Sequence, residues 1–489
     1  MITRWGGIGA AIIIASLSLV LYLPGALHFY FQNDDWVLLG YFGRWRGRDF
    51  WRIFLPWESI WMYRPLQVLE YAAFYKLFGL HPFAYNLSLL LMHVVAAVLA
   101  YVLLRMLAGG RTALLALAIF CLTWVHGEVL LWKGNVNTLQ HACLALAACV
   151  CFLRSSRSDA RRWLVASAGF MLLDLFAKES AVFTPALMLL CAWYARCDRG
   201  AINAGPRRLL MLILPSVILC VVYAAVRAFA FRHLLPEQPT DYVFVGLQRG
   251  IFQFLYSYKF ALLSFYEDPL LLPRVPGVQA VLGAIWGPLV ILPALLLLLA
   301  VRLRDRLLLF ALAWMPIAFG PSLFLERFNL GRYYYLSDIG AALIWARLLL
   351  LATEAVRRIQ ISSVRRAAYF TGTLALAYLA LANIATIRKQ VTEQERDSAT
   401  TRRLFRFVEQ HRAEIPPRSV VWIYPPAHTH TGVEWGAREM IQFASGDTTL
   451  EGHVEGEPLT MARRAKLDGY GVVSIDMRQE PWRLARDLN

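Results

Sequence analysis

Residues 82–104 read PFAYNLSLLLMHVVAAVLAYVLL, and no Asp, Glu, Lys or Arg interrupts them. A helix needs about 20 mainly apolar residues to cross the hydrocarbon core of a bilayer, so this stretch predicts a transmembrane helix. Comparable apolar runs recur along the first 387 positions: Ile8 to Phe29, Thr112 to Leu131, Val136 to Leu153, Leu209 to Phe231, Gln279 to Ala300, Leu307 to Phe324 and Ala367 to Ile387. Such repetition is typical of a polytopic membrane protein.

The composition and the charge distribution support the same class. Of 489 residues, 58% are hydrophobic and only 17% are charged, whereas soluble domains carry more polar surface. The net charge of +16 is concentrated in short gaps between alternate apolar runs, where the arginines cluster: Arg105 and Arg111; Arg154, Arg157, Arg161 and Arg162; Arg196, Arg199, Arg207 and Arg208; Arg302, Arg304 and Arg306; Arg357, Arg358, Arg365 and Arg366. Basic short loops stay cytoplasmic. The charge therefore reports topology, and we expect no nucleic-acid partner.

The arginine gaps also predict the orientation. With them inside, the N-terminus is cytoplasmic, and the gaps 30–81, 126–135, 174–180, 232–278 and 325–336 face outward. Trp163 to Ala195 predicts two short helices that turn at Lys178, and Leu247 to Tyr266 predicts an outer amphipathic or re-entrant helix. This assignment gives about 11 transmembrane helices. We expect a multi-pass protein of the plasma (inner) membrane.

The predicted fold class is an all-α polytopic membrane protein with a small C-terminal α/β extracytoplasmic domain. Residues 1–387 form the transmembrane domain, with a first outer loop at 30–81, and residues 388–489 form the extracytoplasmic domain. In the latter, 388–411 predicts a polar helix, and Ser419 to Tyr424 and Val472 to Ile475 predict strands. All seven cysteines fall in spans or cytoplasmic gaps, so we expect neither disulfides nor a thiolate metal site.

The first outward gap contains adjacent carboxylates, Asp34 and Asp35. Two neighbouring carboxylates at a membrane interface repel one another, which raises a pKa and suits one of them to proton abstraction or metal binding. The alternative, which the spacing alone favours, is that both aspartates cap the helix that begins at Trp36. Arg64, at the start of a helix predicted to end at Phe78, can hold an anion at the helix N-terminus or can snorkel to lipid phosphates.

Three further outward gaps contain ionisable groups. His126 and Glu128 lie in or at the end of an apolar run, where such groups are costly and usually functional, although the pair is a weak signal for metal. Lys178 and Glu179 can neutralise one another at the hairpin turn. The last gap contains Glu326, Arg327, Arg332, Tyr333, Tyr334 and Tyr335, and its tyrosines also suit an interfacial aromatic belt. Cations gathered on one face predict a pocket that holds an anionic leaving group.

The order of these motifs resembles the GT-C class of membrane glycosyltransferases, specifically its protein O-mannosyltransferase-like group. The resemblance covers about residues 8–350 and rests on five short motifs: Asn33-Asp34-Asp35-Trp36; Arg64-Pro65-Leu66 with Phe78-Gly79-Leu80-His81-Pro82; His126 and Glu128 with Trp132; Lys178-Glu179; and Arg332-Tyr333-Tyr334-Tyr335-Leu336. It implies a polyprenyl-phosphate-linked sugar donor and transfer to an acceptor hydroxyl on the outer face, with inversion at the anomeric carbon.

The resemblance also implies roles for individual residues. Asp34 matches the family's general base, and Asp35 matches a second acid that orients the base or the acceptor. The implied ligands of the donor phosphate are Arg64, Lys133, Lys178 and Arg332, and the implied acceptor pocket comprises His126, Glu128, Glu179, Arg327, Tyr333 and Tyr335.

No cofactor is required in this scheme, and a divalent cation is possible but not indicated. The expected partners are the lipid bilayer, the polyprenyl-phosphate sugar donor, and a protein, glycan or lipid acceptor. The alternative function is a non-catalytic binding protein or transporter for polyprenyl-linked sugars, which would use the same cations without a working base.

Overall fold

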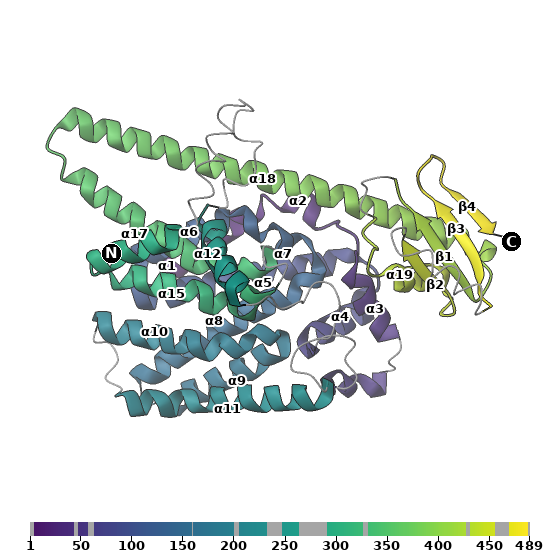
Figure 1. Ribbon diagram of the computed structural model, residues 1–489, viewed down its shortest axis with the longest axis horizontal. Helices are drawn as coiled ribbons and strands as arrows, with labels where there is room; N and C mark the ends of the chain where they lie inside the picture. Colours follow the sequence, from purple (N-terminus) through teal and green to yellow (C-terminus); the bar gives the residue numbers. More distant parts are fainter. Residues whose placement is uncertain are drawn as a thin grey trace.

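The computed structural model describes residues 4–43, 47–56, 63–158, 160–199, 205–231, 247–263, 291–325, 331–426, 431–454 and 469–487. These residues form a bundle of long helices with a small α/β domain at one end (Figure 1). The N-terminal half contains α1 (Arg4–Leu19), α2 (Leu23–Ala26), α3 (Asp34–Gly43), η1 (Gly47–Phe54), α4 (Pro65–Phe78), α5 (Pro82–Ala108), α6 (Gly110–Leu122), η3 (Trp124–His126), α7 (Gly127–Leu131), η4 (Lys133–Asn135), α8 (Val136–Arg157), α9 (Arg161–Ala177), η5 (Glu179–Phe183), α10 (Thr184–Arg199) and α11 (Pro206–Phe231).

The C-terminal half continues the bundle and then forms the small domain. Its helices are α12 (Leu247–Leu263), α14 (Leu292–Arg302), α15 (Arg306–Phe319), η9 (Gly320–Phe324), α16 (Gly331–Tyr334), α17 (Asp338–Arg357), α18 (Ser362–Gln410), η10 (Arg412–Glu414) and α19 (Ala437–Ser445). Its strands are β1 (Ser419–Tyr424), β2 (Glu451–Val454), β3 (Gly471–Asp476) and β4 (Arg483–Asp487).

Within the described residues, six helices are long and apolar enough to cross a membrane, or up to seven if one bent pair is a single span. Three shorter apolar helices, at Gly6–Leu19, Leu292–Arg302 and Arg306–Phe319, accompany them. The prediction of a multi-pass, mainly helical membrane protein with a small C-terminal sheet is therefore confirmed. The total of about 11 spans stays a prediction, because most of the outward gap 232–278 and the first residues of the run from Gln279 lie outside the described residues.

Two apolar runs that predict single helices are broken. The run from Thr112 is interrupted at Thr123, whose extended backbone separates α6 from η3 and α7, and the two parts are bent by 56°. The Trp124 amide donates to Asn383 Oδ1 of α18 at 3.1 Å, so a side chain replaces the missing helical acceptor. In the run from Leu307, Gly320 ends α15 with φ +57°, a conformation that glycine adopts without a Cβ clash.

The hairpin predicted to turn at Lys178 is present as α9, η5 and α10. A buried polar contact joins its two arms to α8. Asp174 Oδ1 lies 2.7 Å from His141 Nδ1, and Asp174 Oδ2 accepts a 2.8 Å hydrogen bond from Thr184 Oγ1. All three residues are buried. Because apolar packing in a membrane is weakly directional, this polar contact helps to fix how the three helices meet.

Asp174→Ala is expected to destabilise the protein, because it leaves both His141 and Thr184 without their buried partner. Each unsatisfied buried polar group costs about 1–3 kcal/mol. The measurement is the apparent melting temperature of the purified protein in detergent. Asp174→Asn keeps an acceptor for the Thr184 hydroxyl, so its melting temperature should fall less than that of Asp174→Ala. Equal melting temperatures for Asp174→Ala and the unmodified protein would contradict the prediction.

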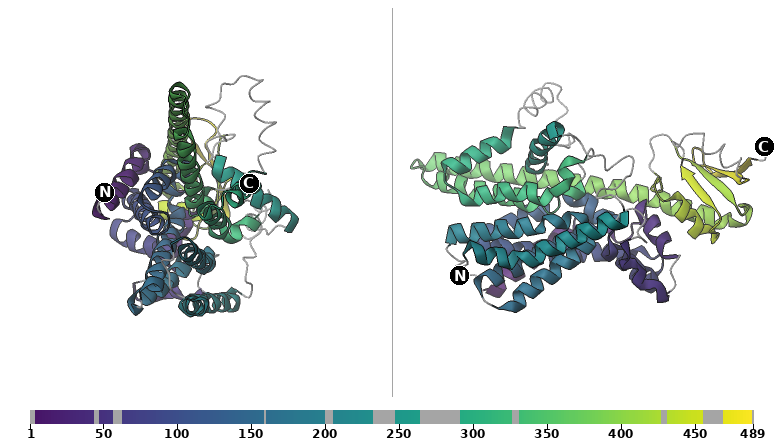
Figure 2. Two further views of the ribbon diagram at one scale, coloured as in Figure 1. Left: turned by 90° about the vertical axis from the view of Figure 1, so that its left-hand side faces the viewer. Right: turned by 60° about the horizontal axis from the view of Figure 1, so that its bottom comes forward.

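The helix α18 is 49 residues long and continuous. It runs the length of the bundle and carries the small domain at its far end (Figures 1 and 2). The polar helix predicted at 388–411 is thus the continuation of the last apolar helix, and the predicted boundary at 387 falls inside α18. Its apolar half is poorly covered by protein, as expected for a helix that faces lipid.

In the described residues, the small domain contains a four-stranded sheet with the strand order β2-β1-β3-β4. β1 pairs in parallel with β2 and β3, and β4 pairs antiparallel with β3. The two predicted strands correspond to β1 and β3, whereas β2 and β4 were not predicted from the sequence. The helix α19 packs against β2 and also contacts α3 of the first outer loop. The sheet domain is therefore docked on the loop that carries the two aspartates.

Candidate functional site

Asp35 lies at the centre of the first outer loop and is fully buried. Its Oδ1 accepts a 2.6 Å hydrogen bond from Tyr71 Oη, and its Oδ2 accepts a 2.8 Å hydrogen bond from the Gln32 amide. Burial raises the pKa of Asp35 to about 6, although the nearby Lys133 ammonium opposes this rise. The helix was predicted to begin at Trp36 with both aspartates as caps, but α3 begins at Asp34, so Asp35 lies in its first turn and accepts from an amide that precedes the helix. Its side chain is an internal support of the loop.

The pH dependence of stability is expected to report on Asp35. Because its pKa is raised above the ordinary value of 3.8 on folding, the folded protein binds more protons between about pH 4 and 6. This group therefore contributes stability at low pH that is lost as the pH rises through 6. Asp35→Asn cannot titrate, so the melting temperature of the unmodified protein minus that of the variant should fall between about pH 4.5 and 7. A constant difference would contradict this assignment.

Asp34 is the neighbour of Asp35 in the first turn of α3, and it is partly exposed. The loop before it is held by the C-terminal part of the chain. The Asn33 amide donates to Gly432 O at 2.7 Å, and the Tyr30 amide donates to Ser398 Oγ of α18 at 2.5 Å. The Trp36 ring stacks on Phe405 of α18, with centroids 5.4 Å apart. These contacts hold Asp34 on a rigid turn at the surface.

Two cations, Lys178 and Arg332, lie over the ring of Tyr333, and a third, Arg64, lies close enough to Lys178 to interact with it electrostatically. The Arg64 guanidinium forms a bidentate pair with Glu179, with Nε–Oε2 at 2.9 Å and Nη2–Oε1 at 2.5 Å. The Lys178 ammonium donates to Thr138 Oγ1 at 3.0 Å and lies 5.7 Å from the Tyr333 ring centroid. The Arg332 guanidinium lies 5.3 Å from the same centroid. Arg64 precedes α4, Lys178 follows α9 and Arg332 lies in α16, so distant segments meet here.

Glu128 completes this arrangement. Its Oε1 accepts from Arg332 Nη1 at 3.0 Å, and its Oε2 accepts from the Arg332 backbone amide at 3.1 Å. The cations Arg64, Lys178 and Arg332 stand against the carboxylates of Glu128 and Glu179, so three positive charges face two negative ones. Both carboxylate side chains are 27% exposed, which leaves the cluster open on one side. An anion that enters there would meet a surplus of positive charge.

Lys133 lies elsewhere. Its buried ammonium donates to Phe29 O at 2.7 Å and to Tyr30 O at 2.8 Å, at the end of the first apolar segment. It also lies 5.1 Å from the Phe31 ring centroid. These contacts use the ammonium to stabilise the backbone that leads into the aspartate loop. Of the four cations expected to bind donor phosphate, three are brought together and Lys133 supports the loop.

Two of the residues expected in an acceptor pocket, His126 and Tyr335, are buried in a different cluster. The Tyr335 hydroxyl lies 2.7 Å from His93 Nδ1, and His126 Nε2 lies 3.3 Å from Asp338 Oδ2. The rings of His126 and Tyr335 are 4.5 Å apart, centroid to centroid. This polar core joins α5, η3 and α17. Arg327, also expected in the pocket, lies outside the described residues.

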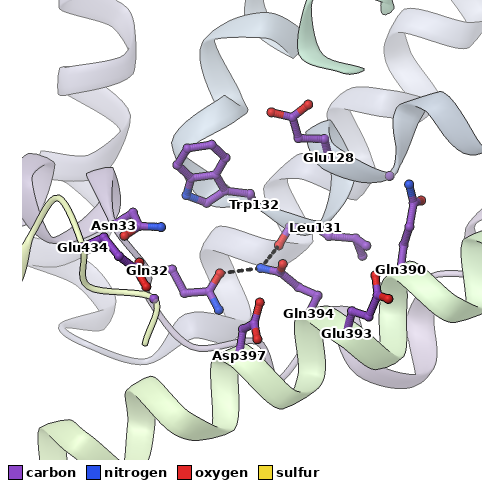
Figure 3. Close-up of a pocket in the computed structure, with 12 residues that line it drawn as sticks. Gln32, Asn33, Glu128, Leu131, Trp132, Gln390, Glu393, Gln394, Asp397 and Glu434 are labelled. Carbon is purple, nitrogen blue, oxygen red and sulfur yellow. Dashed lines mark hydrogen bonds between the residues drawn. The ribbon is translucent and has the colours of Figure 1, made fainter. Parts of the chain in front are cut away.

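A cavity of about 290 Å³ lies between the first outer loop, α7 and the polar half of α18. Figure 3 shows carboxylates and carboxamides from these elements around it. The lining residues are Gln32, Asn33, Gly127, Glu128, Leu131, Trp132, Gln390, Glu393, Gln394, Asp397, Gly432 and Glu434. The contribution of α18 was missed from the sequence. Its signal was the recurrence of amides and acids at 390, 393, 394 and 397, which is the spacing of one helix face.

The described part of the chain contains no cluster of three or more His, Cys, Asp or Glu side chains arranged to hold a metal ion. No protein-family model matches the sequence, and a comparison with curated proteins also finds no match. Similarity appears when the structure is compared with solved structures.

One similar structure is ArnT from Cupriavidus metallidurans bound to undecaprenyl phosphate, with 16% sequence identity and a TM-score of 0.51. The alignment covers 96% of this chain and 93% of that one. Another is the archaeal oligosaccharyltransferase AglB from Archaeoglobus fulgidus in complex with an inhibitory peptide and a dolichol-phosphate. It has 14% identity and a TM-score of 0.53, and the alignment covers 96% of this chain and 69% of that one. This chain therefore shares the fold of ArnT and AglB, which confirms the GT-C-like fold expected from the sequence.

Proposed function

We propose that this chain is a glycosyltransferase that moves a sugar from a polyprenyl-phosphate-linked donor to an acceptor hydroxyl. The observation that carries the proposal is the cluster of Arg64, Lys178 and Arg332, in which Arg64 and Arg332 both lie close to Lys178 and only two carboxylates, Glu128 and Glu179, stand against them. A polyprenyl phosphate has a single anionic head group at the membrane surface, and converging cations suit such a group. The solved structures of ArnT and AglB, which share the fold, contain undecaprenyl phosphate and dolichol-phosphate.

The proposed reaction is a single displacement. Asp34 accepts the proton of the acceptor hydroxyl, whose oxygen attacks the anomeric carbon from the face opposite the phosphate. The new carbon–oxygen bond forms as the bond from the anomeric carbon to the phosphate oxygen breaks, and the electron pair leaves with the phosphate. The cations stabilise this developing charge, so the scheme needs no divalent ion. The configuration at the anomeric carbon is inverted.

The two aspartates have different roles in this proposal. Asp34 is partly exposed and is the candidate base, whereas Asp35 is buried against Tyr71 and Gln32 and supports the turn. Asp35 is therefore a positioning residue.

We further propose that the site lies on the extracytoplasmic side of the plasma membrane. The N-terminus and the turn between α17 and α18 lie at the opposite end of the bundle from the sheet domain (Figure 1). That turn is flanked by Arg357, Arg358, Arg365 and Arg366, and basic loops stay in the cytoplasm. The sheet domain and the Asp34 loop would then face outward together.

The test is donor turnover by the purified full-length protein in lipid nanodiscs. Undecaprenyl-phosphate-linked hexoses and pentoses are supplied together with an envelope extract as the source of acceptors. Mass spectrometry should detect free undecaprenyl phosphate and a glycosylated product, both dependent on the protein. Binding of the donors without any release of undecaprenyl phosphate would overturn the enzymatic proposal and favour the binding or transport function.

A further inference from the structure

Three residues that line the cavity described above carry buried polar atoms that have no hydrogen-bond partner within the described residues. They are Gln32 Nε2, Trp132 Nε1 and Gln390 Oε1. The Gln32 side chain is 6% exposed. Its orientation follows from the 2.6 Å hydrogen bond that Gln394 Nε2 donates to Gln32 Oε1, which leaves the Gln32 nitrogen as a donor (Figure 3). Unsatisfied buried polar groups are costly, so they indicate a ligand that is able to pair with them.

These atoms are two donors and one acceptor. A hydroxyl group can both donate and accept a hydrogen bond. A ligand with several hydroxyls can therefore pair with two donors and one acceptor, whichever hydroxyl faces each of them. Trp132 and Leu131 add apolar surface to the lining. The cavity volume of about 290 Å³ is close to the lower end of the range for small-molecule sites, about 300–1,000 Å³. A sugar ring combines hydroxyls with apolar CH groups and is of that size.

The charge of the lining selects among polyhydroxylated ligands. Among the described residues, the lining includes four carboxylates, those of Glu128, Glu393, Asp397 and Glu434, and neither Lys nor Arg. Such a lining repels a phosphate or sulfate group. A single metal ion also fits poorly, because in the described residues no three acidic, histidine or cysteine side chains converge on one point. A neutral or positively charged ligand is favoured.

The cavity lies beside the proposed catalytic groups. Asn33 lines it and directly precedes Asp34. Glu128 and Trp132 also line it, and both contact Arg332: Glu128 through two hydrogen bonds, and Trp132 through its ring, 5.8 Å from the guanidinium carbon. A group bound here would therefore lie between the candidate base and the donor-phosphate cations.

We propose that this cavity is the acceptor site and that it takes a neutral or amino-substituted sugar of a glycan acceptor. That the bound sugar belongs to the acceptor rests on the proposed function. The preference for an uncharged or cationic sugar rests on the cavity alone. Phosphorylated lipid head groups are excluded as the acceptor portion that binds here.

The experiment measures sugar binding to the full-length protein in nanodiscs without donor, by saturation-transfer NMR and calorimetry. Three monosaccharide probes differ in charge: glucosamine is cationic, N-acetylglucosamine is neutral, and N-acetylglucosamine 6-sulfate is anionic. We expect the first two to bind and the sulfated probe to be excluded. Failure of both the cationic and the neutral probe to bind, or preferential binding of the sulfated probe, would overturn the proposal.

Matched variants locate the binding. Gln394→Ala removes the hydrogen bond that orients Gln32 and should weaken binding about tenfold, the effect of roughly one hydrogen bond. Gln410→Ala is the control, since Gln410 is exposed at the end of the same helix. The double variant Glu393→Gln with Asp397→Asn should keep neutral binding and lose the exclusion of the sulfated probe. Equal effects of Gln394→Ala and Gln410→Ala would place the sugar elsewhere and overturn the proposal.

Binding of undecaprenyl phosphate, measured separately by native mass spectrometry, keeps the two proposals distinct. If the sugars bind but no transfer occurs, the glycosyltransferase assignment fails and the sugar site stands. If transfer occurs but the sugars do not bind, the acceptor site is wrong and the proposed function stands.

Discussion

Asp34→Asn is expected to lower sugar transfer by about 10²–10⁴-fold while leaving donor binding unchanged. The substitution keeps the size of the side chain but removes its ability to accept a proton. A general base is needed only as the acceptor hydroxyl is deprotonated in the transition state, so the loss should appear in kcat and not in the affinity for the donor. Because Asp34 is partly exposed in the first turn of α3, the variant should fold normally.

Turnover of undecaprenyl-phosphate-linked sugar in nanodiscs measures the rate, and native mass spectrometry measures donor binding. Glu395→Gln is the matched control, since it makes the same kind of change at an exposed carboxylate on α18 and should retain full activity. If Asp34→Asn retains full transfer, Asp34 is not the base. If it loses donor binding and transfer together, its role lies in holding the site.

The second large effect is expected for Arg332→Ala, which should lower kcat/KM by about 10²–10³-fold, the usual loss when one donor to a developing negative charge is removed. Arg332 is held by Glu128 on one side and lies over Tyr333, so its guanidinium is already oriented before the donor binds. Its removal leaves the Glu128 carboxylate with the backbone amide of residue 332 but without the neutralising guanidinium, which further disfavours an anion.

Arg332→Lys separates charge from geometry. A lysine keeps the positive charge but loses the planar fork that pairs with Glu128, so it should recover part of the activity. The comparison is made with Arg402→Ala, whose guanidinium lies over the Tyr30 ring, 5.8 Å from the ring centroid and outside the cation cluster. If Arg332→Ala and Arg402→Ala reduce kcat/KM equally, the effect is structural and the phosphate role of Arg332 is wrong.

The sequence predicts the three cations of the cluster because they lie in outward gaps, which the arginine pattern separates from the inward ones. The same reasoning cannot separate Lys133 from Lys178. Both are lysines at the outer ends of helices. The Lys133 ammonium, however, donates hydrogen bonds to the Phe29 and Tyr30 carbonyls. Such contacts between distant segments cannot be predicted from the local sequence. His126 and Tyr335 are likewise separated from the cluster by their partners Asp338 and His93, and neighbouring chain positions do not reveal these contacts.

The cavity that we propose as the acceptor site could not be predicted for a different reason. Its walls come from residues near 32, near 130, near 394 and near 434, and they meet only because α18 passes beside the first outer loop. A boundary drawn at 387 separated the apolar half of this helix from its polar half. The hydropathy of a sequence indicates where a helix leaves the lipid, but it does not indicate whether the helix ends there. The continuity of α18 therefore could not be predicted from the composition.

The continuity of α18 sets the height of the cavity above the membrane. A helix rises 1.5 Å per residue, so 49 residues give a rod of about 74 Å, more than twice the roughly 30 Å hydrocarbon core. Counted from Ile387, where the apolar half ends, Gln390 and Asp397 stand about 5 and 15 Å along the rod. A rigid helix anchored in lipid fixes the distance between the membrane surface and the residues that line the cavity. It would admit acceptors whose reactive hydroxyl reaches down to the membrane surface, and a thicker or thinner bilayer would shift the catalytic plane with it.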